Sequence, residues 1–246
     1  MGIYSQLEHN HQVITASILR LAEKPGLISD SDLEGLLSSS RQNIKRIREM
    51  NSQEHNPDYL ELEGRMYRNH AELTCEAFKR SSHPGPPYLD RAEGAYDLYF
   101  DASDRMSASD QQYAGCCLFS AGILAHQVVN QFRSTSFSRE MTNWLIKEYK
   151  AFMSSVDLFR DVDSHQGSRA AYHAGIAALR LSTRTKQPKW TKRQAKAFKL
   201  GLQLSENWEG EDKENFIRET HKKLTMLVSF IDSRKLRTDN YRVRKS

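Results

Sequence analysis

The chain has 246 residues, of which 38% are hydrophobic and 27% are charged, with twelve glycines and six prolines. This length allows one full core or a short array of repeats, and the composition argues against a disordered or membrane-embedded chain. The net charge of +5 is uneven, because residues 184–246 carry 17 Lys and Arg against 8 Asp and Glu, which leaves 19 against 23 before them.

Neither the N-terminus nor the cysteines indicate export. The first twelve residues, MGIYSQLEHNHQ, are polar and do not resemble a signal peptide. Cys75, Cys116 and Cys117 are an odd number without metal-ligand spacing, and residues 161–165, DVDSH, lack a second ligand cluster. We therefore expect reduced, packed thiols, no bound metal or cofactor, and a cytoplasmic or nuclear location.

Apolar residues at helical spacing predict four helices in the first half, at 4–23, 30–50, 58–81 and 87–106. The second is capped by Asp30, Ser31 or Asp32, and the three serines at 38–40 are a candidate break within it. Residues 51–57 are expected to form a polar loop. Residues 81–87, SSHPGPP, predict a turn, and Pro87 suits the first turn of the next helix because its missing N–H costs nothing there.

The longest stretch without a charge, AGCCLFSAGILAHQVV at 114–129, predicts a central helix capped by residues 107–110 and ending near Phe132. Sixteen residues are too few to cross a bilayer, which takes roughly 20. Small residues alternate with large apolar ones in this stretch. That mixture is typical of a helix that its neighbours approach closely.

Four more helices are predicted after it. The sixth begins at Ser136 or Ser138, the seventh spans about 168–182 after a loop at 161–167, the eighth runs from a Thr191 cap to about 205, and the ninth begins at Asp212. Nine helices without a hairpin signal predict an all-α fold of four antiparallel helical hairpins and a final helix. We expect one domain over residues 1–233 and a frayed basic tail at 234–246.

Two short patterns recur and indicate an internal repeat. Ala121-Gly122-Ile123-x-Ala125 returns as Ala174-Gly175-Ile176-x-Ala178, and Lys-Ala-Phe at 150–152 returns at 196–198. Glycines in the first helices (Gly64, Gly122, Gly175), with alanine and aromatic stripes in the second, resemble tetratricopeptide-type helical hairpin repeats. The best local match is at 171–204. The units recur every 50–60 residues rather than every 34. The resemblance implies stacked hairpins that bind a partner.

The leading functional hypothesis is therefore a non-enzymatic interaction protein, in which side chains of the first helices form a groove for a partner protein or peptide. The candidate groove residues are Arg65, Asn69, Asn130, Arg169 and His173. His126, one turn from Asn130, is expected either to be buried with its hydrogen bonds satisfied or to face this groove.

A second hypothesis rests on residues 184–199, RTKQPKWTKRQAKAFK, which contain many cations and no acid. Lys189, Trp190, Lys192, Lys196 and Lys199 are candidates to bind RNA, DNA or an acidic protein surface, as in a helical nucleoprotein or matrix-like protein. The alternative is a solvated helix face with Trp190 packed inward.

A third hypothesis comes from Arg65 and His70, whose spacing resembles the motif of helical ribonucleases of the HEPN type, in which Arg and His act on the scissile phosphate. Five residues along a continuous helix separate the two side chains by about 140°, so they would not converge unless the helix were broken. Packed or surface positions for these two residues are the alternative.

Overall fold

The computed structural model describes residues 2–24, 27–54, 56–80, 86–131 and 138–243, and side chains for these except 86–87, 138 and 230–243. The described residues form nine helices and no strand, as predicted. They are α1 (Ile3–Glu23), α2 (Asp30–Glu54), α3 (Pro57–Arg80), α4 (Pro86–Met106), α5 (Gln111–Gln131), α6 (Ser138–Phe159), α7 (Ser164–Thr185), α8 (Pro188–Ser205) and α9 (Lys213–Val243). The predicted turn at 81–87 lies mostly outside the described residues.

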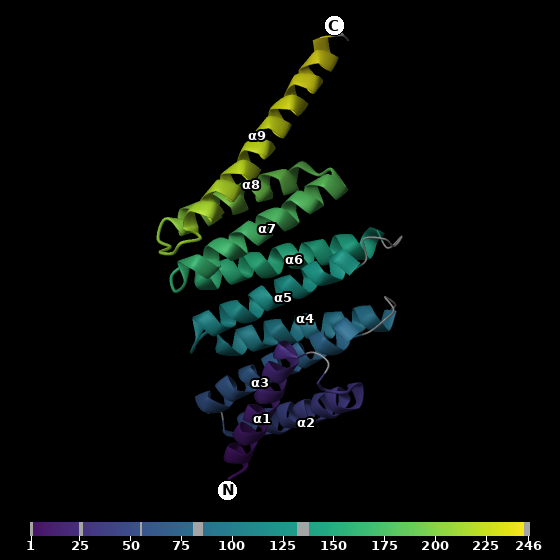
Figure 1. The fold of residues 1–246 in the computed structure, drawn as a ribbon, viewed down its shortest axis with the longest axis vertical. Coiled ribbons are helices and arrows are strands. Elements are labelled where there is room, and N and C mark those ends of the chain that lie inside the picture. The colour runs from purple at the N-terminus through teal and green to yellow at the C-terminus, as the bar shows by residue number, and fades with distance from the viewer. Residues whose placement is uncertain (1, 25–26, 55, 81–85, 132–137, 244–246) are drawn as a thin grey trace.

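Helices α2 to α8 are stacked like the rungs of a ladder, each packing against the helix before it and the helix after it in sequence (Figure 1). Side chains also join every second helix, so the stack has two faces. We call the surface formed by α4, α6 and α8 the second-helix face, and the one formed by α3, α5 and α7 the first-helix face. The helical-repeat prediction is confirmed at this level.

Glycines in the first helices allow the close packing. A Cβ added to Gly122 on α5 would lie 2.6 Å from Phe152 Cε1 on α6. One at Gly175 on α7 would lie 2.5 Å from Phe198 Cε1 on α8. Both distances are far below van der Waals contact. Each phenyl ring therefore occupies the space that the side chain of any residue larger than glycine would need. The two recurring sequence patterns are therefore partners in space.

A second repeated arrangement lies on the second-helix face. The Trp144 ring on α6 meets Tyr96 on α4 edge-on, with centroids 6.0 Å apart, and Lys147 lies over both rings. One unit later, Trp190 on α8 meets Tyr149 on α6 edge-on at 5.4 Å, and Arg193 lies over both. A Trp followed three residues later by a cation thus joins each second helix to the preceding one.

The first helix departs from the predicted hairpin. Helix α1 lies across α2 and α3 rather than alongside α2 alone (Figure 1). Asn69 on α3 donates a hydrogen bond to Thr15 Oγ1 at 2.8 Å, and its Nδ2 lies 3.0 Å from His11 Nδ1. Because both partners belong to α1, this helix covers the N-terminal part of the first-helix face.

Several predicted boundaries are wrong. Helix α2 passes through the serines at 38–40 and continues to Glu54, because Ser40 is buried on the helix rather than free to break it. Helix α7 begins at Ser164 within the predicted loop, where the Asp163 side chain caps it by accepting from Gln166 N. Helix α8 begins at Pro188 rather than at a Thr191 cap, because proline fits the first turn.

Residues 234–243, within the predicted basic tail, continue α9 as a helix that extends away from the stack (Figure 1). Among the described residues, no helix has a stretch long and apolar enough to cross a membrane.

Candidate functional site

The five predicted groove residues do not line one groove. Asn69 is buried beneath α1, and Arg65 pairs with Glu61 in a cavity of about 460 Å³ between α1 and α3. Arg169 and His173 lie on α7 beside Phe119, whereas Asn130 lies near the end of α5 beside Arg180. Helix α1 closes off Asn69, and a groove along the remaining first helices stays a prediction.

His173 is half-buried and packs face to face on Phe152, with centroids 5.1 Å apart, and edge-on against Phe119 at 5.7 Å. Arg169 lies over the Phe119 ring at 5.9 Å. Burial, together with the neighbouring groups Arg169 and His126, lowers the pKa of His173 to about 4. At neutral pH this histidine is an uncharged ring that fills space between α5, α6 and α7.

This burial makes stability depend on pH. The pKa of His173 is lowered from 6.5 when the chain folds, so protons bind preferentially to the unfolded chain below pH 6.5. Stability should therefore fall as the pH drops from 6.5 toward 4. Glutamine cannot titrate, so the free energy of unfolding of His173→Gln should fall less between pH 7 and pH 5 than that of the unmodified chain. We expect the two decreases to differ by about 1–2 kcal/mol in denaturant unfolding. Equal losses in both proteins would show that His173 titrates normally.

A buried carboxylate lies next to this region. Glu148 on α6 is 1% exposed, and its Oε1 lies 2.9 Å from His126 Nδ1 on α5. Arg180 on α7 donates to Glu148 Oε2 at 3.2 Å and to Asn130 Oδ1 at 3.0 Å. Arg180 Nη1 also lies 3.0 Å from His126 Nδ1, but Nδ1 cannot accept from Arg180 while it donates to Glu148. We assign the Nδ1–H of His126 as a donor to the Glu148 carboxylate, which is the stronger acceptor.

Glu148, His126 and Arg180 thus tie three successive helices together, and we call them the charged triad. Its carboxylate is enclosed by protein and already has two partners. Asn130 is engaged by Arg180 rather than free to bind a peptide backbone. The charged triad is therefore a structural element, and a ligand site must be sought elsewhere.

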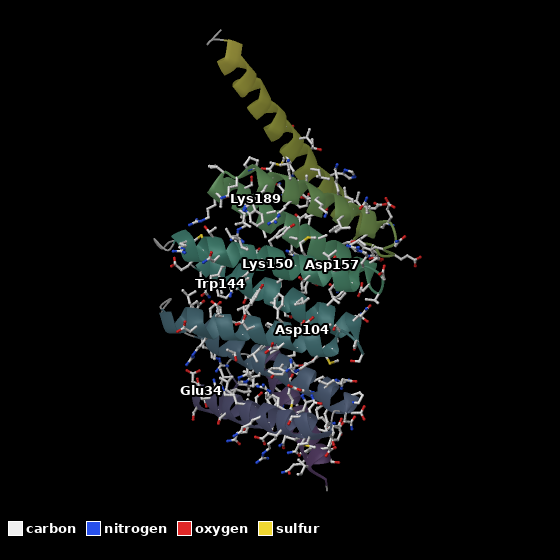
Figure 2. The ribbon with its side chains drawn as sticks, turned by 180° about the vertical axis from the view of Figure 1, so that it is seen from behind. Glu34, Asp104, Trp144, Lys150, Asp157 and Lys189 are labelled. Atoms are coloured by element: carbon white, nitrogen blue, oxygen red, sulfur yellow. The ribbon has the colours of Figure 1, made fainter. Side chains whose placement is uncertain are left out.

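A groove lies on the opposite, second-helix face, between α4 and α6, with a cavity volume of about 730 Å³. We call it the second-helix groove. Figure 2 looks onto this face and labels Asp104 on α4 and Trp144, Lys150 and Asp157 on α6. It is lined by aromatic and sulfur-containing side chains between charged ones: Tyr96, Phe100, Tyr149 and Met153, with Asp97, Asp101, Lys147, Lys150, Ser154 and Asp157.

The second-helix groove has acidic side chains on α4 and charges of both signs on α6. Asp97 and Asp101 lie on α4 and are exposed, and Lys150 and Asp157 are exposed on α6. Although its surface is exposed, partial desolvation against the neighbouring helix raises the pKa of Asp97; Lys147 opposes the shift, and Glu93 and Asp101 add to it. An apolar floor with charged edges of both signs is the composition of protein-binding surfaces, where aromatic and methionine side chains contribute most contact.

The basic segment maps to the start of α8. Lys189, Lys192, Lys196 and Lys199 are all exposed, on the side of α8 opposite its buried residues. Within the described part of the chain, no carboxylate lies within 4.0 Å of them. Trp190 is 3% exposed, so the prediction that its ring is available for base stacking is wrong. It is packed inward against Tyr149 instead.

The remaining candidates are structural. Cys75 and Cys117 are buried free thiols, and burial raises the pKa of each to about 12, which suppresses the reactive thiolate. His70 is buried in the unbroken helix α3, while Arg65 is exposed. Among the described residues, no group of three or more His, Cys, Asp or Glu side chains could hold a metal ion.

No sequence pattern used above predicted the second-helix groove or the charged triad. The Lys-Ala-Phe repeat contained a usable signal, because Trp144 and Trp190 share its spacing of 46 residues, as do Phe152 and Phe198. Aligning the tryptophans would have shown that α6 and α8 present equivalent faces. Nothing local distinguishes the buried Glu148 from a surface glutamate.

No protein-family model matches the chain, and a search of curated proteins also finds no match. Among solved structures, the chain is similar to a de novo designed helical repeat protein, DHR64, with a TM-score of 0.47 and 14% identity over 87% of this chain and 99% of that one. The DHF58 filament is similar at a TM-score of 0.46 and 10% identity, over 87% of this chain and 95% of that one.

Proposed function

We propose that the protein is a non-enzymatic helical-repeat scaffold that binds a segment of a partner protein in the second-helix groove. The observation that carries this proposal is the cavity of about 730 Å³ between α4 and α6. Stacked helical repeats commonly bind partners on the extended surfaces that their successive units form. The buried thiols are compatible with a reducing compartment, the cytoplasm or nucleus.

The groove chemistry defines the segment it would take. Phe100 and Met153 are half-exposed and offer apolar contact, whereas Tyr96 is buried beneath them. Asp97 and Asp101 would attract a cation, and Lys150 an anion from the same segment. We therefore expect a segment with an apolar anchor residue between a basic and an acidic side chain.

A selection of displayed random peptides on the purified protein tests this proposal. We expect enrichment of segments with the charge order above, and at least about tenfold weaker binding of them to the double variant Asp101→Lys, Lys150→Glu. Both positions are exposed, so folding should be unaffected. Arg169→Glu, on the first-helix face, is the control and should bind normally. Equal weakening by both proteins would contradict the proposed location.

A helical nucleic-acid-binding protein is the second candidate, favoured by the four exposed lysines of α8. The unmodified protein and the groove variants also serve to test this candidate. A triple variant that combines Lys192→Glu, Lys196→Glu and Lys199→Glu is added to them. Fluorescence anisotropy with short RNA and DNA should show salt-sensitive binding that this variant abolishes. If peptides bind the groove and nucleic acid does not bind at micromolar protein, the second candidate fails and the first stands.

A further inference from the structure

The last two repeat units can be aligned residue by residue through their contacts. Positions on α5 and α7 correspond at a spacing of 53, from Gly122 to Gly175, and those on α6 and α8 at 46, from Phe152 to Phe198. The next helices follow the same rule. The ring of Phe119 is 5.7 Å from His173, and that of its counterpart Tyr172 is 5.8 Å from Phe216, so α7 and α9 correspond at 43.

These spacings locate the counterpart of the charged triad. The counterpart of His126, 53 residues later, is Leu179. That of Glu148, 46 residues later, is Gln194, and that of Arg180, 43 residues later, is Lys223. All three counterparts line a single cavity of about 370 Å³ between α7, α8 and α9, which we call the terminal pocket. The terminal pocket therefore lies where the preceding unit is filled by the charged triad around the buried Glu148.

The replacements change the charge of the position. The carboxylate of Glu148 becomes the neutral carboxamide of Gln194, while Lys223 keeps the positive charge of Arg180. Lys186 adds a second cation, and Ser182 and Thr183 add hydroxyls to the wall. In the described part of the chain, neither lysine has a carboxylate within 4.0 Å. The terminal pocket thus has cations without the anion that the preceding unit supplies.

Gln194 provides an independent sign of a missing ligand. It is 2% exposed, and its Oε1 is buried with no hydrogen-bond partner among the described residues. Native proteins rarely leave a buried polar atom unpaired, because the lost hydrogen bonds to water are not replaced. The oxygen and nitrogen of an amide are assigned from their partners, and a flipped Gln194 places its N–H donors at this position, where an anionic group can accept from them.

We propose that the terminal pocket binds a small amphiphilic monocarboxylate, with its apolar chain against Leu179, Met226 and Leu227 and its carboxylate at Lys223 and Lys186. The carboxylate would supply the negative charge that Glu148 supplies to the charged triad, and the Gln194 amide group would donate to it. At about 30 Å³ for each water-sized group, the cavity of about 370 Å³ accommodates about twelve non-hydrogen atoms. A ten-carbon fatty acid has this size.

Isothermal titration calorimetry with decanoate, below the concentration at which it forms micelles, tests the proposal on the full chain. We expect saturable binding at one site. Gln194→Glu places a carboxylate against the ligand and should weaken binding at least about tenfold, and Lys223→Ala should weaken it by a similar factor. The matched controls Gln203→Glu and Lys222→Ala change the same residue types at exposed positions on the same helices and should bind normally.

Three results would overturn the proposal. The first is no decanoate binding by the unmodified chain. The second is tighter binding of decylammonium than of decanoate, which would require an anionic rather than a cationic pocket. The third is a dimer in sedimentation that Met226→Glu dissociates and decanoate leaves intact, which would assign the terminal pocket to a second copy. Gln194 is buried, so Gln194→Glu can lower the melting temperature. In that event the result for Lys223→Ala, at a partly exposed position, decides the test.

Discussion

Replacing Gly122 with leucine is expected to lower the free energy of unfolding by about 3 kcal/mol, the upper end of the range for overpacked cores. A single Cβ at this position would already lie 2.6 Å from Phe152 Cε1. The Phe152 ring is fully buried, so it has no space into which it can move. The two helices must separate instead, and thermal or denaturant unfolding measures the loss.

The matched control is Gly94→Ala on α4, where an added Cβ meets nothing within 4 Å. Alanine favours helix over glycine, so this change should stabilise the protein by about 0.5–1 kcal/mol. If Gly122→Leu left the unfolding free energy unchanged, the close contact between α5 and α6, and with it the repeat, would be wrong.

The second large effect concerns the charged triad. Glu148→Ala should destabilise the protein by about 3 kcal/mol, because it leaves the partly buried charge of Arg180 without its carboxylate. Glu148→Gln should cost less, because the equivalent position in the next unit is already a glutamine, Gln194. Denaturant unfolding of both variants measures the difference.

Asp157→Ala is the control for a carboxylate on the same helix. Asp157 pairs with Arg160 at 3.0 Å, but both side chains are at least half exposed, so the change should have little effect. If Glu148→Ala were as mild as this control, Glu148 would not be the buried centre of three helices.

Much of the fold could be predicted from the sequence because the determinants are local. Apolar residues at helical spacing predicted the existence and type of all nine helices that the described residues form. The Ala-Gly-Ile and Lys-Ala-Phe patterns predicted the repeat, since a glycine on one helix and a phenylalanine on the next fit each other. Boundaries were less accurate where a side chain decides them, as Asp163 does at the start of α7.

The candidate sites could not be predicted in the same way, because they depend on which helices meet. Asn69 was predicted to face a peptide groove, but α1 covers it through Thr15 and His11. The second-helix groove requires side chains of α4 and α6 to meet across α5, as Tyr96 and Trp144 do, and no local pattern in either helix encodes that contact. Trp190 was open to two interpretations, and packing against Tyr149 selected the buried one.

Site-specific photo-crosslinking in cells that produce the protein tests the central claim most directly. A photoreactive amino acid would replace Ser154 in the second-helix groove or, in a separate sample, Arg169 on the first-helix face. The account predicts a discrete crosslinked partner protein from position 154, lost in the Asp101→Lys, Lys150→Glu background, and none from position 169. A partner captured from position 169 and not from 154 would contradict it and place the binding surface on the first helices.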